Sequence, residues 1–119
     1  SKKIPIYGNG KQKREWIFVD DFISSIDFII SKNLTKENFL IGSGIRFENK
    51  KFVKKIIEIF KKYLNYDETK IKLVRVRDRP GHDKEYKVDS SKIRRLGWKS
   101  KTNIVSDLLK TINYYKSNL

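Results

Sequence analysis

The sequence contains neither cysteine nor methionine, and it has only one histidine, two prolines and six glycines among its 119 residues. Without cysteine, the chain can form no disulfide and no thiolate metal site, and we expect a reducing compartment, the cytoplasm. A single histidine argues against a transition-metal site, so we expect no bound metal. Because the chain begins with Ser1 and lacks methionine, we also expect a processed start or a piece of a longer protein.

Long hydrophobic runs are missing as well. The longest apolar cluster, residues 26–30, is interrupted by Asp27 and is far shorter than the about 20 apolar residues of a membrane-spanning helix. The amino-terminal residues show no secretory signal, and we expect no membrane partner. The sequence also has no dinucleotide-binding glycine fingerprint, no Walker loop and no serine nucleophile elbow, so we expect no NAD site within this chain.

Acidic residues are scarce relative to basic ones. There are 28 lysines and arginines against 14 aspartates and glutamates, which gives a formal net charge of +14. Such a balance is typical of proteins that bind polyanions. Lysines outnumber arginines by 21 to 7, however, and they are spread over every expected helix, whereas nucleic-acid-binding proteins more often concentrate arginines and aromatics in one stripe. We interpret the charge mainly as a compositional bias and keep a small nucleic-acid-binding protein as an alternative.

Apolar segments and turn residues alternate in the way expected of an α/β protein. Strands are predicted for residues 4–7, 15–19, 38–41 and 71–77, and helices for residues 20–32, 49–64, 90–96 and 103–116. The helix over 49–64 is the clearest, because its apolar residues recur every 3.6 positions with lysines on the opposite face. A few short strands with about four helices are too few for an independent parallel sheet, so we expect part of a larger fold.

Polar residues at the ends of the expected elements supply functional candidates. Asp20 and Asp21 open the first helix. Adjacent carboxylates at a helix start are typical of capping, and an acid–base pair is the less favoured interpretation. Asn49 opens the second helix as its expected N-cap, although a helix amino terminus also attracts phosphate. Arg14 precedes a buried segment; it is either a surface arginine or a phosphate clamp, which the planar guanidinium suits.

The most informative segment is the run Asp78-Arg79-Pro80-Gly81-His82-Asp83. Proline fixes φ and glycine admits left-handed geometry, so the Pro-Gly pair predicts a stiff turn at the end of a strand. Arg79 and His82 flank this turn and place two candidate oxyanion partners on a rigid, exposed support. We therefore expect the turn to hold a negatively charged ligand.

Taken in order, these segments resemble dTDP-glucose 4,6-dehydratases, which are extended short-chain dehydrogenase/reductase enzymes that act on nucleotide sugars. The Asp78–Asp83 turn separates this family from its epimerase relatives. Two departures are Glu15, where many members carry aspartate, and residues 44–47, where a polar run is commoner. The matching segments cover essentially the whole chain: Ile4-Pro5-Ile6-Tyr7-Gly8, Arg14 to Val19 with Asp21, Ile41-Gly42-Ser43-Gly44 with Asn49 and Val53, the turn itself, and Asp89 with Lys92-Ile93 and Leu96-Gly97-Trp98.

The resemblance implies that residues 1–119 are the carboxy-terminal, sugar-nucleotide-binding domain of an extended Rossmann-type α/β enzyme, without its amino-terminal NAD-binding domain. The complete enzyme would oxidise a dTDP-sugar at C4 with bound NAD, eliminate water across C5 and C6, and return the hydride to C6. Such chemistry belongs to deoxysugar biosynthesis, for example of rhamnose. By resemblance, the complete enzyme would be a cytoplasmic homodimer, and this chain, lacking catalytic and NAD-binding residues, would be inactive alone.

The same resemblance assigns substrate-binding roles, and these fit the chemistry of a nucleoside diphosphate, which needs cationic partners and an apolar slot for the base. Alternatives from the same class are another nucleotide-sugar dehydratase, epimerase or decarboxylase. A structural or interaction module is a further alternative. By resemblance, the nucleoside pocket would be lined by Pro5, Ile6 and Tyr7, the diphosphate held by Arg14 and Arg79, the nucleotide contacted by Asn49, and the same end supported by His82.

Overall fold

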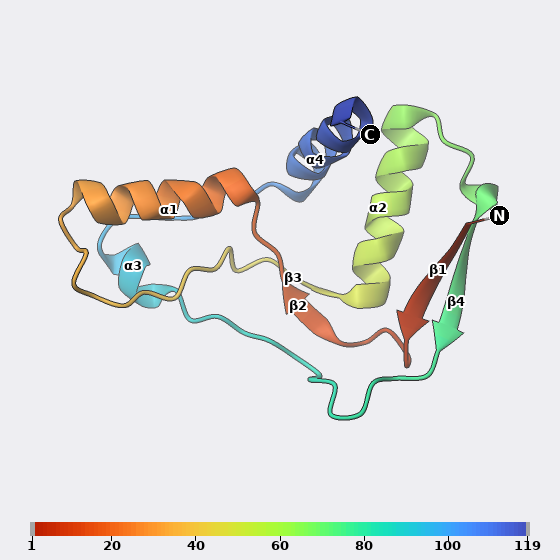
Figure 1. Cartoon of the computed structure of the whole chain (residues 1–119), viewed down its shortest axis with the longest axis horizontal. Helices are drawn as coiled ribbons and strands as arrows, with labels where there is room; N and C mark the ends of the chain where they lie inside the picture. Colours follow the sequence, from red (N-terminus) through yellow and green to blue (C-terminus); the bar gives the residue numbers. More distant parts are fainter. Residues whose placement is uncertain (1, 119) are drawn as a thin grey trace.

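The computed structural model describes residues 2–118, and the chain is an α/β protein as expected. It is elongated, with extents of 51 × 37 × 21 Å. Figure 1 shows α1 and α3 at one end, α2 with β1 and β4 at the other, and β2 and β3 between them. The elements are, in order, β1 (Lys2–Tyr7), β2 (Lys13–Glu15), α1 (Val19–Ser31), β3 (Arg46–Glu48), α2 (Asn49–Leu64), the 3-10 helix η1 (Glu68–Lys70), β4 (Ile71–Val76), α3 (Ser91–Arg95) and α4 (Ile104–Asn118).

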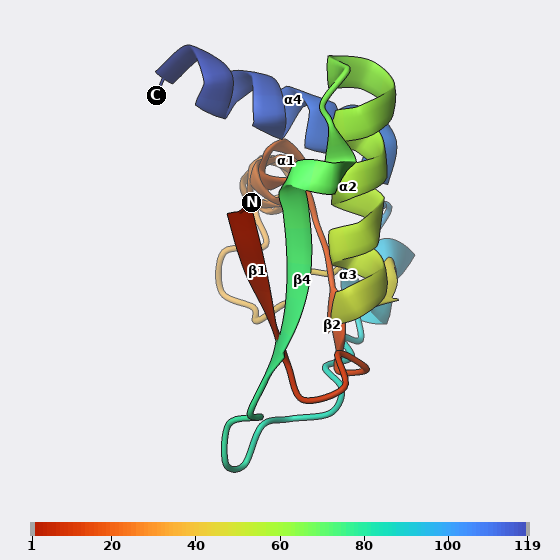
Figure 2. The same ribbon diagram turned by 90° about the vertical axis from the view of Figure 1, so that its right-hand side faces the viewer.

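The strands form two separate pairs. β1 and β4 are parallel, with Lys2 opposite Ile71 and Tyr7 opposite Val76, whereas β2 and β3 are antiparallel. Figure 2 shows β1 and β4 side by side, with α2 next to the pair. Side chains alternate across β1, so that Ile6 is buried while its neighbours are exposed. Both parallel strands end at the same edge of the pair, and the loop that contains the Pro-Gly turn leaves β4 there.

The helices follow the predicted periodicity closely. The predicted helix over residues 49–64 is confirmed as α2, and Phe52 and Ile59 on its apolar stripe are buried. Phe52 stacks on Trp16 with ring centroids 3.7 Å apart and planes 11° apart, which joins α2 to the segment after β2. Within residues 2–118, no helix has both the length and the hydropathy needed to cross a membrane. The buried hydrophobic side chains are Ile6, Phe52, Ile59, Ile93, Trp98 and Ile112.

Two glycines shape the turn after β1. Gly8 and Gly10 have φ of +58° and +71°, in the left-handed region that side chains rarely adopt. A Cβ at Gly8 would lie 2.9 Å from Asp78 Oδ2, and a Cβ at Gly10 would lie 2.7 Å from Lys50 Cβ. The glycine turn therefore packs closely against both the end of β4 and the start of α2.

Two of the predicted strands are wrong. The strand expected over residues 15–19 is only β2, Lys13–Glu15, because Trp16 turns inward to stack on Phe52 and Val19 already begins α1. Residues 38–41 form no strand; they have no pairing partner among the described residues, and Leu40 is 63% exposed. A strand-like sequence needs a neighbouring strand to satisfy its backbone groups.

The expected capping roles of Asp20, Asp21 and Asn49 are wrong. Phe18 is the N-cap residue of α1 and Glu48 that of α2, and neither helix has a side-chain capping hydrogen bond. The carboxylates still lie in the first turn of α1, where they complement the partial positive charge of the helix terminus. Side-chain caps are not needed here, because segments far away in sequence bind to both helix starts.

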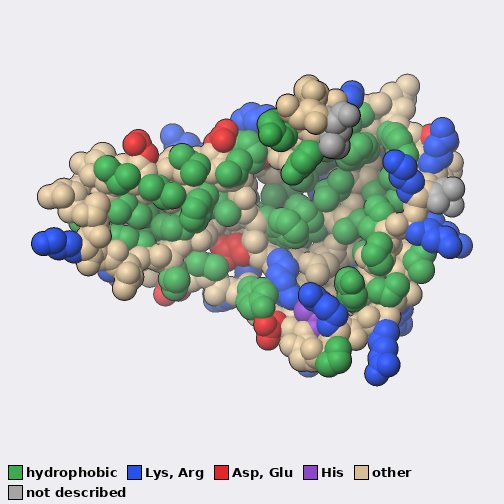
Figure 3. Space-filling model, in the orientation of Figure 1, with side chains coloured by type: hydrophobic (Ala, Val, Ile, Leu, Met, Phe, Trp, Pro, Cys, Tyr) green, Lys and Arg blue, Asp and Glu red, His purple; other side chains and the backbone are tan. Residues whose placement is uncertain are grey.

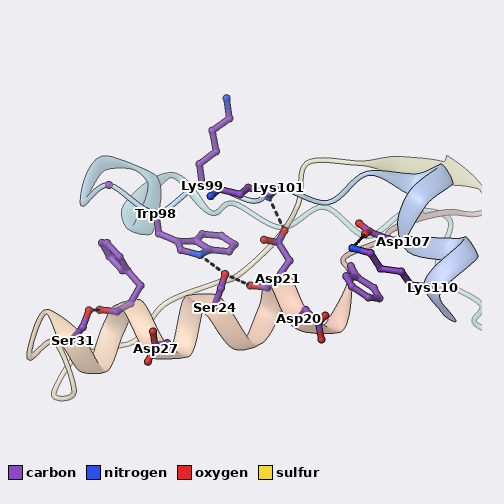
Figure 4. A pocket seen from close by; sticks show the side chains of 13 residues that line it. Asp20, Asp21, Ser24, Asp27, Ser31, Trp98, Lys99, Lys101, Asp107 and Lys110 are labelled. Carbon is purple, nitrogen blue, oxygen red and sulfur yellow. Dashed lines mark hydrogen bonds and ion pairs between the residues drawn. The ribbon is translucent and has the colours of Figure 1, made fainter. Parts of the chain in front are cut away.

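Asp21 joins α1 to the loop that precedes α4 (Figure 4). Its Oδ2 accepts hydrogen bonds from the Lys101 and Thr102 backbone N–H groups at 2.9 and 3.0 Å, and from the Ser100 and Thr102 hydroxyls. Burial raises the pKa of this carboxyl, but the hydrogen bonds from Ser100, Lys101 and Thr102 outweigh that effect and hold the pKa below its ordinary value of 3.8. The ionised carboxylate is thus a fixed acceptor between two helices.

We expect Asp21→Asn to lower the free energy of unfolding of the full-length protein by about 1.5–3 kcal/mol at pH 7, because hydrogen bonds to a charge are lost. Since the folded pKa is lowered, the stabilisation is present above the ordinary pKa of 3.8 and is lost as the pH falls through the folded value. Urea unfolding should therefore show a difference that shrinks below about pH 4. The exposed neighbour provides the control, Asp20→Asn, and equal losses for the two variants at pH 7 would contradict the assignment.

Candidate functional site

The short strand β2 is bound on both of its edges. One edge pairs with β3, where Arg14 lies opposite Phe47. On the other edge the Lys13 N–H donates to the Lys84 carbonyl at 2.8 Å, and the Lys13 carbonyl accepts from the Tyr86 N–H at 3.2 Å. The segment that follows the Pro-Gly turn is therefore attached directly to β2, which brings Arg14 beside the loop after β4.

The predicted Pro-Gly turn is confirmed. The His82 N–H donates to the Arg79 carbonyl at 3.2 Å, and Gly81 has a φ of +68°, as the third residue of such a turn requires. The backbone at residues 79–81 is exposed at the end of the loop. The loop thus offers a rigid, solvent-facing corner opposite Arg14.

A cleft of about 280 Å³ lies between β2 and this corner, and two guanidinium groups reach it. Arg14 donates from Nη1 to the Lys13 carbonyl at 2.7 Å and from Nη2 to the Asp83 carbonyl at 3.0 Å, and its guanidinium lies 4.4 Å from the centroid of the Tyr86 ring. The Arg79 guanidinium lies 5.3 Å from the centroid of the Tyr7 ring. Among the described residues, neither arginine is ion-paired with a carboxylate, and the two guanidinium groups outnumber the one carboxylate that lines the cleft, Asp83.

A buried histidine holds Arg79 in place. Arg79 Nη2 lies 3.0 Å from His82 Nε2, and His82 Nδ1 lies 2.6 Å from Asp78 Oδ1. A guanidinium can only donate, so Nε2 is the acceptor and the ring proton is on Nδ1, which donates to the carboxylate. This tautomer, which is assigned from the partners of the ring, makes Asp78, His82 and Arg79 one directed chain of hydrogen bonds.

The expectation that His82 offers an exposed oxyanion partner is wrong. Its side chain is only 6% exposed, and its two nitrogens are occupied by Asp78 and Arg79. The hydrogen bond from His82 is the main effect that lowers the pKa of the Asp78 carboxyl, and the Arg79 backbone N–H lowers it further. Asp78 therefore stays ionised, and His82 acts on the cleft through Arg79.

The remaining predicted residues, Pro5, Ile6, Tyr7 and Asn49, lie outside the lining of the cleft. Tyr7 is exposed and packs edge-on against His82, with ring centroids 6.3 Å apart. Pro5 is exposed on β1 two residues before Tyr7, whereas the Ile6 side chain is buried in the core. Asn49 does not line the cleft; its backbone N–H donates to the Gln12 carbonyl at 2.8 Å, so the first N–H of α2 is already occupied.

The contact of Tyr86 with Arg14 in the cleft was not predicted from the sequence. Its ring supports the Arg14 guanidinium, and its hydroxyl donates to the Asp83 carboxylate, which raises the pKa of the Tyr86 hydroxyl. Nothing in the sequence around Tyr86 distinguishes it from other exposed aromatics, since only the backbone pairing with Lys13 places it beside Arg14.

A larger cavity of about 530 Å³ lies between α1, the loop before α4, and α4 itself (Figure 4). Its polar groups bind one another: the Trp98 Nε1–H donates to Ser24 Oγ at 3.0 Å, and Asp107 and Lys110 form an ion pair at 3.5 Å. Asp21 is bound to the loop backbone, and the cavity wall carries further charges of both signs, from Asp20, Asp27, Lys99 and Lys101. This cavity is a junction between helices, and the arginine cleft is the candidate site.

The chain is thus an α/β protein with one parallel strand pair and a cleft that two arginines reach. The family model described as GDP-mannose 4,6 dehydratase matches residues 1–111, and the chain belongs to that family. It is 34% identical to the dTDP-glucose 4,6-dehydratase of Haemophilus influenzae and 36% identical to dTDP-glucose 4,6-dehydratase 1 of Escherichia coli K12. Each match covers 98% of this chain but only 36% and 33% of the relative, so the chain spans about a third of their length.

Solved structures of dTDP-glucose 4,6-dehydratases also match nearly the whole of this chain over about a third of their own length. The dTDP-glucose 4,6-dehydratase DesIV from Streptomyces venezuelae, with NAD and TYD bound, matches with a TM-score of 0.82 and 29% identity over 98% of this chain and 34% of its own. The dTDP-glucose 4,6-dehydratase from Bacillus anthracis, in complex with NAD, matches with a TM-score of 0.77 and 30% identity over 98% and 35%. These likenesses confirm the Rossmann-type α/β fold class and the resemblance drawn from the sequence.

We expect His82→Ala to raise the pKa of the Asp78 carboxyl toward its ordinary value of 3.8, because the hydrogen bond from His82 is the main cause of its lowered pKa. Carbon-13 NMR titration of the aspartate side chains measures this directly. Asp67 is a matched control, since its lowered pKa comes from hydrogen bonds of Thr69. The assignment fails if Asp78 titrates unchanged in the variant, or if Asp67 shifts by the same amount.

Proposed function

We propose that this chain is the sugar-nucleotide-binding part of an NAD-dependent nucleotide-sugar 4,6-dehydratase that acts on a dTDP-sugar. The observation that carries the proposal is the cleft in which Arg14 and Arg79, free of carboxylate partners among the described residues, face one ligand-sized space. The names of the similar dehydratases, which are dTDP-glucose enzymes, support the choice of substrate.

The two arginines suit a diphosphate for separate reasons. Arg14 is fixed by two backbone carbonyls and by the Tyr86 ring, so that binding an anion costs it little side-chain freedom. Arg79 is fixed by His82 and presents its remaining donors to the cleft. Two guanidinium groups bind the two phosphates with charge-assisted hydrogen bonds. We propose that the exposed rings of Pro5 and Tyr7 on β1, beside the cleft, form one wall for the base, that Ile6 supports β1 from the core, and that Asn49 contacts the nucleotide.

The chemistry itself is proposed to take place outside this chain. The sequence has no glycine fingerprint, so its residues do not form a dinucleotide cradle. In the complete enzyme, bound NAD would accept the hydride from C4 and return it to C6. We propose that an amino-terminal Rossmann domain holds NAD and the catalytic residues, and that residues 1–119 alone bind and orient the sugar nucleotide without turning it over. The complete enzyme is further proposed to be a cytoplasmic homodimer of deoxysugar biosynthesis.

The helix α1 supports the presence of such a second domain. Its buried residues, Asp21 and Ser25, are polar, whereas five of its seven large apolar side chains are 40–62% exposed. This is the reverse of an amphipathic helix that packs on its own core, and Figure 3 shows the apolar side chains gathered over α1. We propose that the amino-terminal domain covers this face and that residues 38–41 pair with its sheet. The exposed apolar residues of α1 are Val19, Phe22, Ile23, Ile26 and Ile30.

We expect Arg14→Ala and Arg79→Ala, each in the full-length enzyme, to raise the KM for dTDP-glucose about tenfold to hundredfold, because a charge-assisted contact to the diphosphate is lost. Steady-state kinetics measure this, and Arg94→Ala on α3, outside the cleft, is the control. An unchanged KM in both cleft variants would rule out the clamp. Parallel assays with UDP- and GDP-sugars identify the base of the substrate. Turnover by residues 1–119 with added NAD would contradict the proposal that catalysis takes place outside this chain.

We expect Ile23→Asp to lower the melting temperature of the full-length enzyme by about 5–10 °C, because a charge would be buried under the proposed domain contact. In residues 1–119 alone the same change faces solvent and should leave the unfolding transition unshifted. Lys54→Asp on the exposed face of α2 is the control in both proteins. If Ile23→Asp leaves the full-length enzyme as stable as the wild type, the face is not covered.

A further inference from the structure

We infer that Gln12 is a positioning residue for Arg79, acting through Asp78 and His82. This inference rests on the proposed function, in which Arg79 binds the diphosphate of the substrate. Gln12 lies in the loop between β1 and β2 and is only 6% exposed, although the lysines on both sides of it are exposed. A buried glutamine within a basic surface loop is unusual, because the amide must find partners in the interior.

The hydrogen-bond donors of Gln12 account for its position. Its Nε2 lies 3.0 Å from Asp78 Oδ2, 3.3 Å from the Tyr7 carbonyl and 3.3 Å from His82 Nδ1. The amide has two hydrogens, and His82 Nδ1 is itself a donor to Asp78, so the hydrogens go to the carboxylate and to the carbonyl. The opposite orientation would place Oε1 against two acceptors.

Gln12 thereby connects three segments of the chain. Its Nε2 joins the end of β1 at Tyr7 to Asp78 after β4, and its backbone carbonyl accepts the first N–H of α2 from Asn49 at 2.8 Å. With Gln12 on one carboxylate oxygen and His82 on the other, Asp78 cannot rotate away from the histidine. The order of support runs from Gln12 to Asp78, from Asp78 to His82, and from His82 to Arg79.

The carbonyl oxygen of the Gln12 amide indicates that the hydrogen bonds of Nε2, and not packing, account for the position of the side chain. Gln12 Oε1 is buried and has no hydrogen-bond partner among the described residues. Burying an unpaired amide oxygen is unfavourable, so an apolar side chain of the same length would suit a purely structural position better. The hydrogen bonds of Gln12 are therefore made by its donors, which point to Asp78 and to the end of β1.

The test uses Gln12→Met in the full-length protein, because methionine keeps the length and volume but has no donor. We expect the Kd for dTDP, measured by calorimetry, to rise about fivefold to twentyfold, while the thermal unfolding temperature stays the same or increases. Lys11→Met, at the exposed neighbouring position, is the control and should leave the Kd unchanged. Gln12→Asn, which keeps the amide but is one methylene too short, should weaken binding like methionine and serves if the methionine variant does not fold.

A double-mutant cycle separates positioning from general loosening of the loop. In an Arg79→Ala background Gln12→Met should change the Kd less than about twofold, whereas in an Arg14→Ala background its full effect should remain. Nitrogen-15 NMR gives a readout without ligand: rotation of the Arg79 guanidinium should be hindered in the wild type and faster in Gln12→Met, with Arg14 unaffected.

The outcomes distinguish the two proposals. If Arg79→Ala itself leaves the affinity for dTDP unchanged, the proposed diphosphate site fails, and the NMR rotation rates alone decide whether Gln12 positions Arg79. If Arg79→Ala weakens binding but Gln12→Met does not, the role of Gln12 is overturned. An equal effect of Gln12→Met in both arginine backgrounds, or an unchanged rotation rate of Arg79, overturns it as well.

Discussion

The candidate site depends on the backbone pairing at Lys13. This residue belongs to a strand of only three residues, yet its N–H and its carbonyl both bind the segment 84–86, while β3 occupies the other edge. Because neighbouring residues of a strand point to opposite sides, the pairing at Lys13 fixes where Arg14 projects and also where Tyr86 lies. The two arginines come from segments far apart in the sequence, and without this contact they would share no cleft.

Charge is organised locally in the site and dispersed elsewhere. The protein carries a net charge of +14, and its ion pairs along α2, such as Lys51 with Glu48 and Lys55 with Glu58, are exposed and contribute little to stability. In the site, by contrast, the one carboxylate in direct contact with the buried His82 is Asp78, which stays ionised because of that contact. The positive potential at the cleft therefore comes from two oriented guanidinium groups and not from the overall excess of lysine.

Apolar surface is exposed on α1, away from the cleft. The chain has a modest core, and apolar side chains of α1 are exposed to solvent. The cleft lies elsewhere on the molecule, beside β2. The chain also spans about a third of the length of its relatives. These facts support the proposal of a partner domain that covers α1 and supplies a neighbouring strand for residues 38–41.

Local sequence patterns predicted the elements that local physics controls. The apolar period of residues 49–64 defined α2 to the residue, the short apolar segments at residues 4–7 and 71–77 indicated β1 and β4, and the Pro-Gly pair defined the turn at Gly81. The family resemblance was likewise readable from ordered short motifs, above all from residues 78–83. The absence of the strand expected at residues 38–41 was not predictable in the same way, because a strand forms only where another strand supplies hydrogen-bond partners.

The roles of single site residues were decided by the tertiary structure. From the sequence, His82 and Arg79 were equivalent candidates for an anion; in the fold one is buried beneath the other, because Asp78 and Gln12 approach from two different loops. Asn49 and the first-turn aspartates of α1 lost their expected capping roles for the same reason, since distant backbone and side chains bind the helix starts. The sequence alone determined which cationic and aromatic groups the protein has. Only the packing of distant segments determined which of these groups face the cleft and which hold the others in place, because burial and hydrogen-bond partners are properties of the folded chain.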